Sequence, residues 1–141
     1  MKKLFLPFLA LSFSLLSCQK EEVPEKVCEL NDTNLAGTYR LTAVTYKKDA
    51  ASPTVNEFAA YPACQLDDEV VFKADKTISF NDTGIACTPP KNSSSTWSIA
   101  GNVVTFGIDP FVVSSFDCKQ FSGTFTGDAP GELTTITLTR K

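Results

Sequence analysis

The chain has 141 residues, of which 43% are hydrophobic, and it carries 13 basic and 16 acidic residues. This length and composition indicate one globular domain with its own hydrophobic core. The mildly acidic balance, and the lack of any run of basic residues longer than Lys47-Lys48, argue against a nucleic-acid-binding protein, which would present clustered basic charge.

The N-terminal segment has the layout of a secretory signal peptide. Met1-Lys2-Lys3 is a positively charged start, residues 4–16 form an apolar run, and Ser17 is small. The run contains Pro7 and is shorter than the roughly 18 apolar residues that a membrane-spanning helix needs. We therefore expect residues 1–17 to be removed.

The end of the apolar run carries a motif for lipid attachment. Leu15-Leu16-Ser17-Cys18 places a small residue before a thiol, and it resembles the bacterial lipobox. The resemblance implies that Cys18 is lipidated and becomes the first residue of the mature chain. Two or three acyl chains would hold the protein at a bilayer almost permanently, because each buried methylene contributes about 0.8 kcal/mol. An ordinary signal peptide followed by a chance cysteine is the alternative.

The residues after Cys18 bear on the destination of the protein. Gln19-Lys20-Glu21-Glu22 is similar to the lysine-and-acid signal of surface-exported lipoproteins of the Bacteroidota type. The same residues fit a solvated, charged tether that Pro24 keeps extended, and both interpretations can hold together. We expect a lipidated N terminus and tether over residues 18–34, with the protein anchored to the outer membrane and its inward or outward orientation left open.

Four cysteines remain once Cys18 is assigned to lipid, and an even number outside the cytoplasm usually indicates disulfides. We favour a bond between Cys64 and Cys87, because they bracket an apparent hairpin, which leaves Cys28 for Cys118. The chain-entropy treatment gives about 3.4 kcal/mol for the first loop and about 4.6 kcal/mol for the second. A zinc site is the alternative, but the chain has no Cys-x-x-Cys spacing and no histidine. We expect no metal and no other cofactor.

From Leu35 onward, β-branched and aromatic residues alternate with polar ones between clusters of Gly, Pro, Asn and Asp, which predicts strands. No long window has helical periodicity. The expected strands and hairpins, in chain order, are residues 37–46, a short segment at 57–61, a hairpin at 69–80, a second hairpin at 96–106, and strands near 111–116, 119–125 and 133–140.

The alternation also predicts which side chains face the core. Tyr39, Leu41 and Ala43 share one face of the first strand. The two hairpins turn near Asp75-Lys76 and at Gly101-Asn102. The other inward side chains are expected to be Val70, Phe72, Ile78, Phe80, Trp97, Ile99, Val104, Phe106, Ile136 and Leu138. About eight strands with short connections predict an all-β fold, a small antiparallel up-and-down β-barrel whose closure removes the sheet edges.

Residues 35–141 resemble the lipocalin-like domains of small bacterial lipoproteins. The similar segments are Leu35-Ala36-Gly37-Thr38-Tyr39, Cys64-Gln65-Leu66-Asp67-Asp68, Phe72-Lys73-Ala74-Asp75, Gly84-Ile85-Ala86-Cys87, and Thr96-Trp97-Ser98-Ile99 with Gly101-Asn102. Lipocalins usually carry Gly-x-Trp at the first strand and an arginine after the last strand. Here Tyr39 stands at the Trp position, and the resemblance implies that Arg140 packs on its ring as a cation–π pair. It also implies a barrel whose mouth takes a small apolar ligand.

The inward aromatic residues are bulky for an eight-stranded barrel, which favours a filled core over a ligand cavity. A ligand site, if the barrel has one, is expected to be lined by Tyr39, Phe72, Phe80, Trp97 and Phe106. The expected function is then that of a membrane-anchored envelope lipoprotein that binds a small hydrophobic ligand. The alternative is a protein-binding accessory or inhibitor module with a filled barrel and an exposed apolar patch made by Phe58, Tyr61, Phe111 and Phe116.

An enzyme is not expected. The chain lacks histidine, and its acidic run Asp67-Asp68-Glu69 is typical of a solvated turn before a strand. Catalytic carboxylate pairs come from facing elements and are partly buried, which adjacent turn residues rarely are. The run also lacks the alternating spacing of a calcium-binding loop.

Overall fold

The computed structural model describes residues 28–141. The predicted signal peptide, Cys18 and the tether as far as residue 27 lie outside the described residues. The elements in chain order are α1 (Asp32–Leu35), β1 (Gly37–Lys47), β2 (Val55–Asn56), the 3-10 helix η1 (Phe58–Ala60), α2 (Ala63–Leu66), β3 (Glu69–Phe72), β4 (Thr77–Asn81), β5 (Ser93–Ala100), β6 (Val103–Phe106), β7 (Asp109–Phe116), β8 (Gln120–Thr126) and β9 (Leu133–Arg140).

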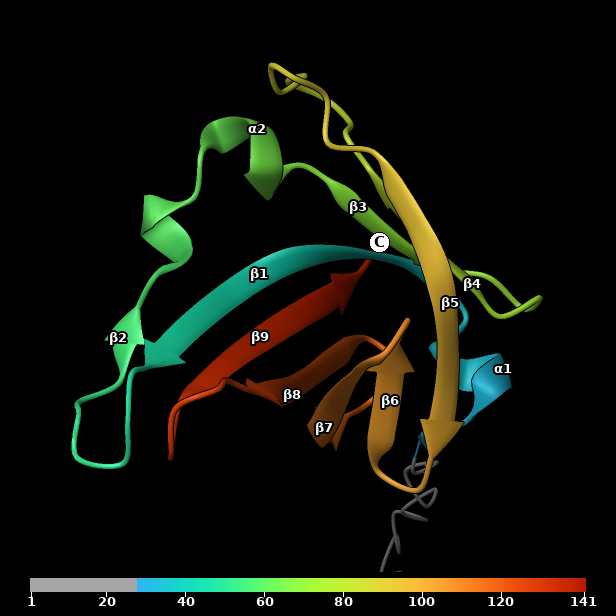
Figure 1. Cartoon of the computed structure of the whole chain (residues 1–141). Helices are drawn as coiled ribbons and strands as arrows, with labels where there is room; N and C mark the ends of the chain where they lie inside the picture. Colours follow the sequence, from blue (N-terminus) through green and yellow to red (C-terminus); the bar gives the residue numbers. More distant parts are fainter. Residues whose placement is uncertain (1–27) are drawn as a thin grey trace, which may run out of the picture.

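The strands form one closed antiparallel sheet (Figure 1). Its order is β2-β1-β3-β4-β5-β6-β7-β8-β9, and β1 also pairs with β9, which joins the two ends of the meander. Eight of the nine strands make the barrel, and the two-residue strand β2 pairs only with the C-terminal end of β1, at Thr45 and Tyr46. The predicted all-β up-and-down barrel is therefore confirmed.

The prediction of a strand at residues 57–61 is wrong. The strand there is β2, at Val55–Asn56, and the chain then turns into η1 and α2. The side chain of Asn56 accepts a hydrogen bond from the backbone N–H of Phe58 at 3.0 Å. This local bond turns the chain out of the sheet, because an Asn side chain that holds the backbone two residues on competes with strand pairing. No helix in the described residues has the length and apolar character needed to cross a membrane.

Both predicted hairpins are present. In the first, β3 pairs with β4, and the side chain of Asp75 accepts from the N–H of Thr77 at 2.9 Å while Lys76 takes a φ of 70°. In the second, β5 pairs with β6, and Gly101 takes a φ of 61°, a conformation that glycine adopts without steric cost. Turn chemistry visible in the sequence thus fixes both registers.

The predicted core-facing set of β1 is wrong at one position. Along the β1–β9 pairing, Leu41 lies opposite Leu138 but Ala43 lies opposite Thr137, so a β-bulge places Thr42 as an extra residue. An extra residue reverses the alternation beyond it. Val44, only 1% exposed, therefore faces the core in place of Ala43.

The buried core lies on the α1 side of the barrel. Its members are Leu35, Tyr39, Phe72, Ile78, Trp97, Val104, Phe111, Phe121 and Leu138. Phe72 is at its centre, with ring centroids of Tyr39 and Trp97 at 5.6 and 5.7 Å in edge-to-face geometry. Leu35, from α1, is fully buried in the same cluster, so the short helix closes this part of the barrel.

Two residues of the expected exposed patch are inside the barrel. Phe111 is fully buried, and Phe116 packs against the core with its ring centroid 6.3 Å from that of Phe121. The ring of Phe111 crosses Gly123 of the neighbouring strand so closely that a methyl group there would overlap it. The prediction that Phe111 is exposed is wrong, because β7 turns this side chain inward.

Candidate functional site

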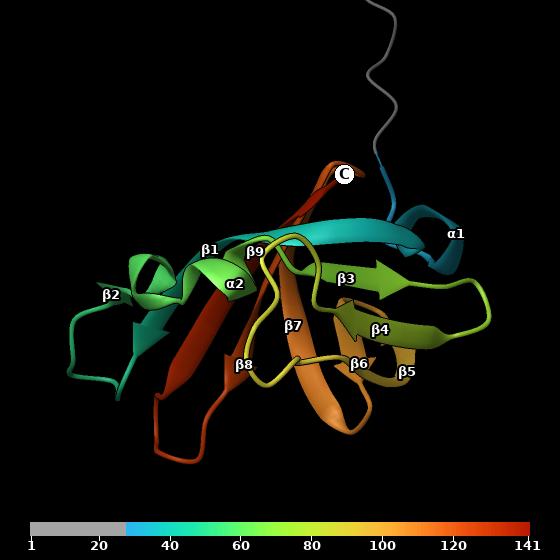
Figure 2. The same cartoon turned by 90° about the horizontal axis from the view of Figure 1, so that it is seen from above.

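A cavity of about 250 Å³ lies next to the filled core, on the side of α2. The helices α1 and α2 lie well apart on the barrel in both Figure 1 and Figure 2. The cavity wall is made by apolar side chains of β1, β3, β4, β6, β8 and β9, and four polar residues join them at the rim. The lining residues are Leu41, Val70, Ile78, Phe80, Phe106, Phe125, Ile136 and Leu138, with Tyr61, Gln65, Asp68 and Glu69. The expectation of a filled barrel is therefore wrong for this part of the interior.

The cavity contains only part of the predicted ligand-binding set. Phe80 and Phe106 line it. Tyr39, Phe72 and Trp97 are instead buried in the filled core, with exposures of 0%, 1% and 2%. All five side chains face the interior, but alternation along a strand says nothing of how far along the barrel axis each one lies.

Phe125 and Tyr61 were not predicted to line a cavity. Phe125 follows Phe121 and Gly123 on the inward face of β8, so alternation along that strand could have identified it. Tyr61 reaches the cavity from the segment between η1 and α2. Its place depends on the turn out of β2, for which the residue pattern gave no indication.

The rim of the cavity is held together by a disulfide and by backbone contacts. Cys64, in α2, is bonded to Cys87, with 5.2 Å between their Cα atoms. The carboxylate of Asp67 accepts from the N–H of Ile85 at 2.7 Å, and the hydroxyl of Thr83 donates to the carbonyl of Asp67 at 2.6 Å. These bonds tie α2 and Asp67 to residues 83–87, which braces the part of the rim that Gln65 and Asp68 form.

The acidic run is not the solvated turn that the sequence predicts. Asp67, Asp68 and Glu69 are all partly buried. Gly84 approaches Asp67 so closely that a Cβ atom would overlap the carboxylate, and its φ of 69° also favours glycine. The run is therefore packed against the loop that follows β4.

The two acidic lining residues differ in their electrostatic surroundings. Glu69 pairs with Arg40 at 3.8 Å and accepts a hydrogen bond from Lys141. Asp68 forms no ion pair among residues 28–141 and accepts only a 3.3 Å hydrogen bond from the N–H of Thr83. Burial raises the pKa of the Asp68 carboxyl, and the carboxylates of Asp82 and Asp67 raise it further. The hydrogen bond from Thr83 and the more distant charge of Lys91 lower the pKa in part.

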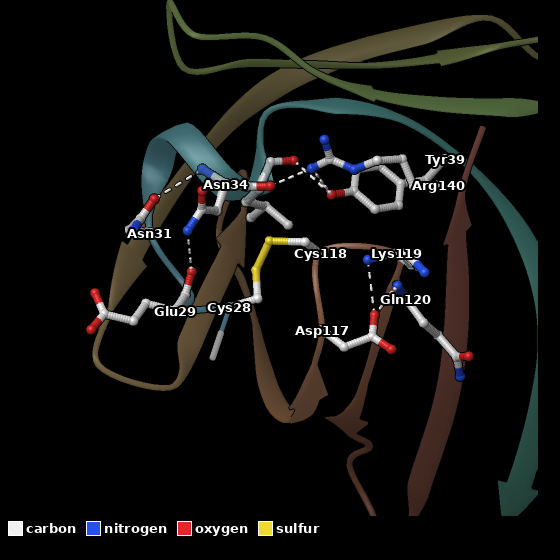
Figure 3. The surroundings of a disulfide bond; sticks show 11 residues. Cys28, Glu29, Asn31, Asn34, Tyr39, Asp117, Cys118, Lys119, Gln120 and Arg140 are labelled. Carbon is white, nitrogen blue, oxygen red and sulfur yellow. Dashed lines mark hydrogen bonds between the residues drawn. A yellow bond between two sulfur atoms is a disulfide. The ribbon is translucent and has the colours of Figure 1, made fainter. Parts of the chain in front are cut away.

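The opposite part of the barrel is closed by a polar cluster around Tyr39 (Figure 3). The Tyr39 hydroxyl donates to the carbonyl of Leu35 at 2.9 Å and accepts from Nη2 of Arg140 at 2.7 Å. The guanidinium carbon of Arg140 lies 5.2 Å from the Tyr39 ring centroid, so the packing implied by the resemblance is confirmed. Burial raises the pKa of Tyr39, and the hydrogen bond and charge of Arg140 lower it.

The second disulfide lies beside this cluster (Figure 3). It joins Cys28 to Cys118, at the connection between β7 and β8, with 5.7 Å between the Cα atoms. Arg140 also donates to the carbonyl of Asn34, in α1. The segment that precedes β1 is thus fixed to the barrel by a covalent bond and by Arg140.

The lipocalin-like family model matches residues 35–141. The chain belongs to the lipocalin-like domain family. Every residue that lines the cavity lies within the matched range of this lipocalin-like chain. No match was found among curated proteins or among solved structures. Lipocalin-like domains are typically binding folds rather than catalytic ones. Within residues 28–141, no group of three or more His, Cys, Asp or Glu residues is placed to hold a metal ion.

Proposed function

We propose that this lipocalin-like protein binds a small apolar ligand in its cavity and is held at the outer membrane of a bacterial cell envelope by lipid on Cys18. The observation that supports ligand binding is the cavity of about 250 Å³ with eight apolar side chains in its wall. An apolar cavity of about 150 Å³ accommodates benzene, and drug-sized ligands need roughly 300 Å³ or more. A ligand with one ring or a short alkyl chain therefore suits the available volume.

The alternative, a protein-binding module with a filled barrel, has less support. Of the four side chains expected to form its docking patch, Phe111 is buried, Phe116 packs on the core and Tyr61 lines the cavity. Within residues 28–141, the large exposed apolar side chains are Val55, Ile85, Ile108 and Val112, and none of them belongs to that patch. The interior of the barrel is thus the better candidate site.

Filling the cavity is expected to weaken ligand binding. Ile136 lines the cavity from β9, and Ile136→Phe would place a ring in the space that a ligand needs. Wild-type protein is expected to bind octan-1-ol saturably in isothermal titration calorimetry, and Ile136→Phe at least ~10-fold more weakly, which corresponds to about 1.4 kcal/mol.

Val112→Phe is the matched control for this experiment. Val112 is 43% exposed on β7, so a ring at this position adds the same bulk outside the barrel. Its affinity for octan-1-ol should equal that of the wild type. Equal weakening by both substitutions, or no saturable binding by the wild type, would contradict ligand binding in the cavity.

Replacing Cys18 is expected to release the protein from the membrane. The lipobox resemblance makes the Cys18 thiol the site of acylation, so Cys18→Ser should lose acyl labelling and leave the membrane fraction or retain its signal peptide. Fractionation and labelling with a radioactive fatty acid measure both effects. Ser14→Ala, which leaves Leu15 to Cys18 intact, is the control. Unchanged retention and labelling of Cys18→Ser would rule out the anchor.

A further inference from the structure

The charge at the rim of the cavity points to one class of ligand. We infer, building on the proposed function, that the cavity selects amphiphiles with a cationic amine head over those with a carboxylate head, and that Asp68 binds the amine. The lining residues include two acids, Asp68 and Glu69, and no lysine or arginine within the described part of the chain. The apolar wall beneath them provides the place for the tail.

Glu69 does not supply this selectivity, because its charge is already compensated. Its carboxylate contacts Arg40 and Lys141, and its side chain is 17% exposed. Val70 and Phe72 face the barrel interior, so alternation places the Glu69 side chain on the opposite face of β3, and Glu69 borders the cavity only at its rim. The two cations of this cluster are therefore bound to Glu69 and are not among the residues that line the cavity.

Asp68 is in the position to meet a ligand head group. It comes directly before β3, two residues before Val70, and both residues line the cavity. Its one hydrogen bond, from Thr83, occupies Oδ1, and it forms no ion pair among residues 28–141. Lys91 acts on the Asp68 carboxylate only from beyond ion-pair distance. An ammonium group carries three N–H donors and the opposite charge, so it would give this partly buried carboxylate a direct partner.

A carboxylate head group at the rim is expected to bind less favourably than an amine. At the rim it would approach the like charge of Asp68 in a partly desolvated position, where charges interact more strongly than in water. The hydroxyl of Tyr61 and the amide of Gln65 also line the rim. Both can serve a neutral alcohol head as well as an amine, so a neutral head is expected to be intermediate.

The test compares three ligands with one tail: octylamine, octan-1-ol and octanoate, titrated calorimetrically into the folded domain at pH 7. The wild type is expected to bind octylamine ~10-fold more tightly than octan-1-ol, and octanoate ~10-fold more weakly than octan-1-ol, as for about 1.4 kcal/mol in each step. In Asp68→Asn the affinity ratio of octylamine to octan-1-ol should fall to about 2 or less.

Two further variants make this result specific. Asp32→Asn removes one negative charge from α1, where Asp32 pairs with Lys76 away from the cavity, and should keep the full amine preference. Ile136→Phe should lose octylamine together with octan-1-ol. Asp68→Asn is expected to fold, because the Asn side chain retains the oxygen that accepts from the N–H of Thr83. In addition, burial raises the pKa of the Asp68 carboxyl, so the ionised carboxylate does not stabilise the folded state at pH 7.

The outcomes separate the inference from the proposed function. Saturable binding of octan-1-ol with no preference for octylamine would overturn the inference and leave ligand binding intact. Amine preference that survives in Asp68→Asn, or octylamine binding that survives in Ile136→Phe, would also overturn it, since the amine would then be bound elsewhere. No binding of any of the three ligands would contradict the proposed function itself.

Discussion

Phe72→Ala is expected to lower the free energy of unfolding by about 4 kcal/mol, because truncating a fully buried phenylalanine removes its transfer energy and leaves a cavity. Phe72 is 1% exposed and lies at the centre of the core. Besides Tyr39 and Trp97, its ring neighbours are Phe106 and Phe121, with centroids at 5.7 and 6.0 Å. Urea unfolding followed by tryptophan fluorescence measures the loss, since Trp97 is in direct contact with the substituted ring.

Phe116→Ala is the matched control for this prediction. Phe116 is the same residue type, but it is only partly buried at the margin of the core, where it meets Phe121 at 6.3 Å. Its truncation leaves a space that solvent can enter, and the loss should be smaller than that of Phe72→Ala, about 1–2 kcal/mol. Equal losses in the two variants would show that the α1 side of the barrel is not the main core.

Removing the disulfides is expected to separate stability from ligand binding. In the chain-entropy treatment, the loss of Cys28–Cys118 costs about 1.2 kcal/mol more than the loss of Cys64–Cys87, because it opens a longer loop. The sequence separations of the two bonds are 90 and 23 residues. The double serine variants Cys28→Ser/Cys118→Ser and Cys64→Ser/Cys87→Ser should therefore differ in that order in urea unfolding.

Ligand affinity should follow the opposite order. Cys64–Cys87 ties α2, which lines the cavity through Gln65, to the loop that follows β4. Cys28–Cys118 lies instead beside the cluster around Tyr39 and Arg140 (Figure 3). Without the rim bond, the ligand has to order α2 on binding, which weakens octan-1-ol binding by roughly 10-fold. A variant without Cys28–Cys118 should bind like the wild type. Equal affinities in the two double variants would show that the rim does not need its covalent bond.

The two hairpins could be predicted from the sequence because their turns and strands are determined by residues close together in the chain. Asp75 and Gly101 identify the two turns, and strict alternation on either side identifies Phe72, Ile78, Trp97 and Val104 as inward. A side-chain period of two residues makes this inference robust as long as no residue is inserted. The bulge at Thr42 interrupts the alternation along β1, and the residues of β1 alone do not predict that bulge.

The structure of the segment between β2 and β3 could not be predicted from the sequence, for a different reason. Tyr61 and Gln65 line the cavity from the stretch around η1 and α2, where the sequence predicted a short strand at residues 57–61. Their place depends on the Cys64–Cys87 bond and on contacts between Asp67 and residues 83–85. The residue pattern indicated the disulfide, but the packing of the acidic run against that loop required the folded chain.

The sequence by itself determined the class of fold, the hairpins and most of the side chains that face inward, with Val44 and Phe111 as exceptions. Only the tertiary structure decided which of these side chains fill the core and which surround a cavity: Phe72 and Phe80 face inward from the same hairpin, yet one is packed among aromatic rings and the other lines open space. The physical reason is that alternation sets the side of the sheet, whereas depth along the barrel depends on strand stagger. That stagger depends on the pairing register of β1 with β9, two neighbouring strands that come from the two ends of the domain's sequence.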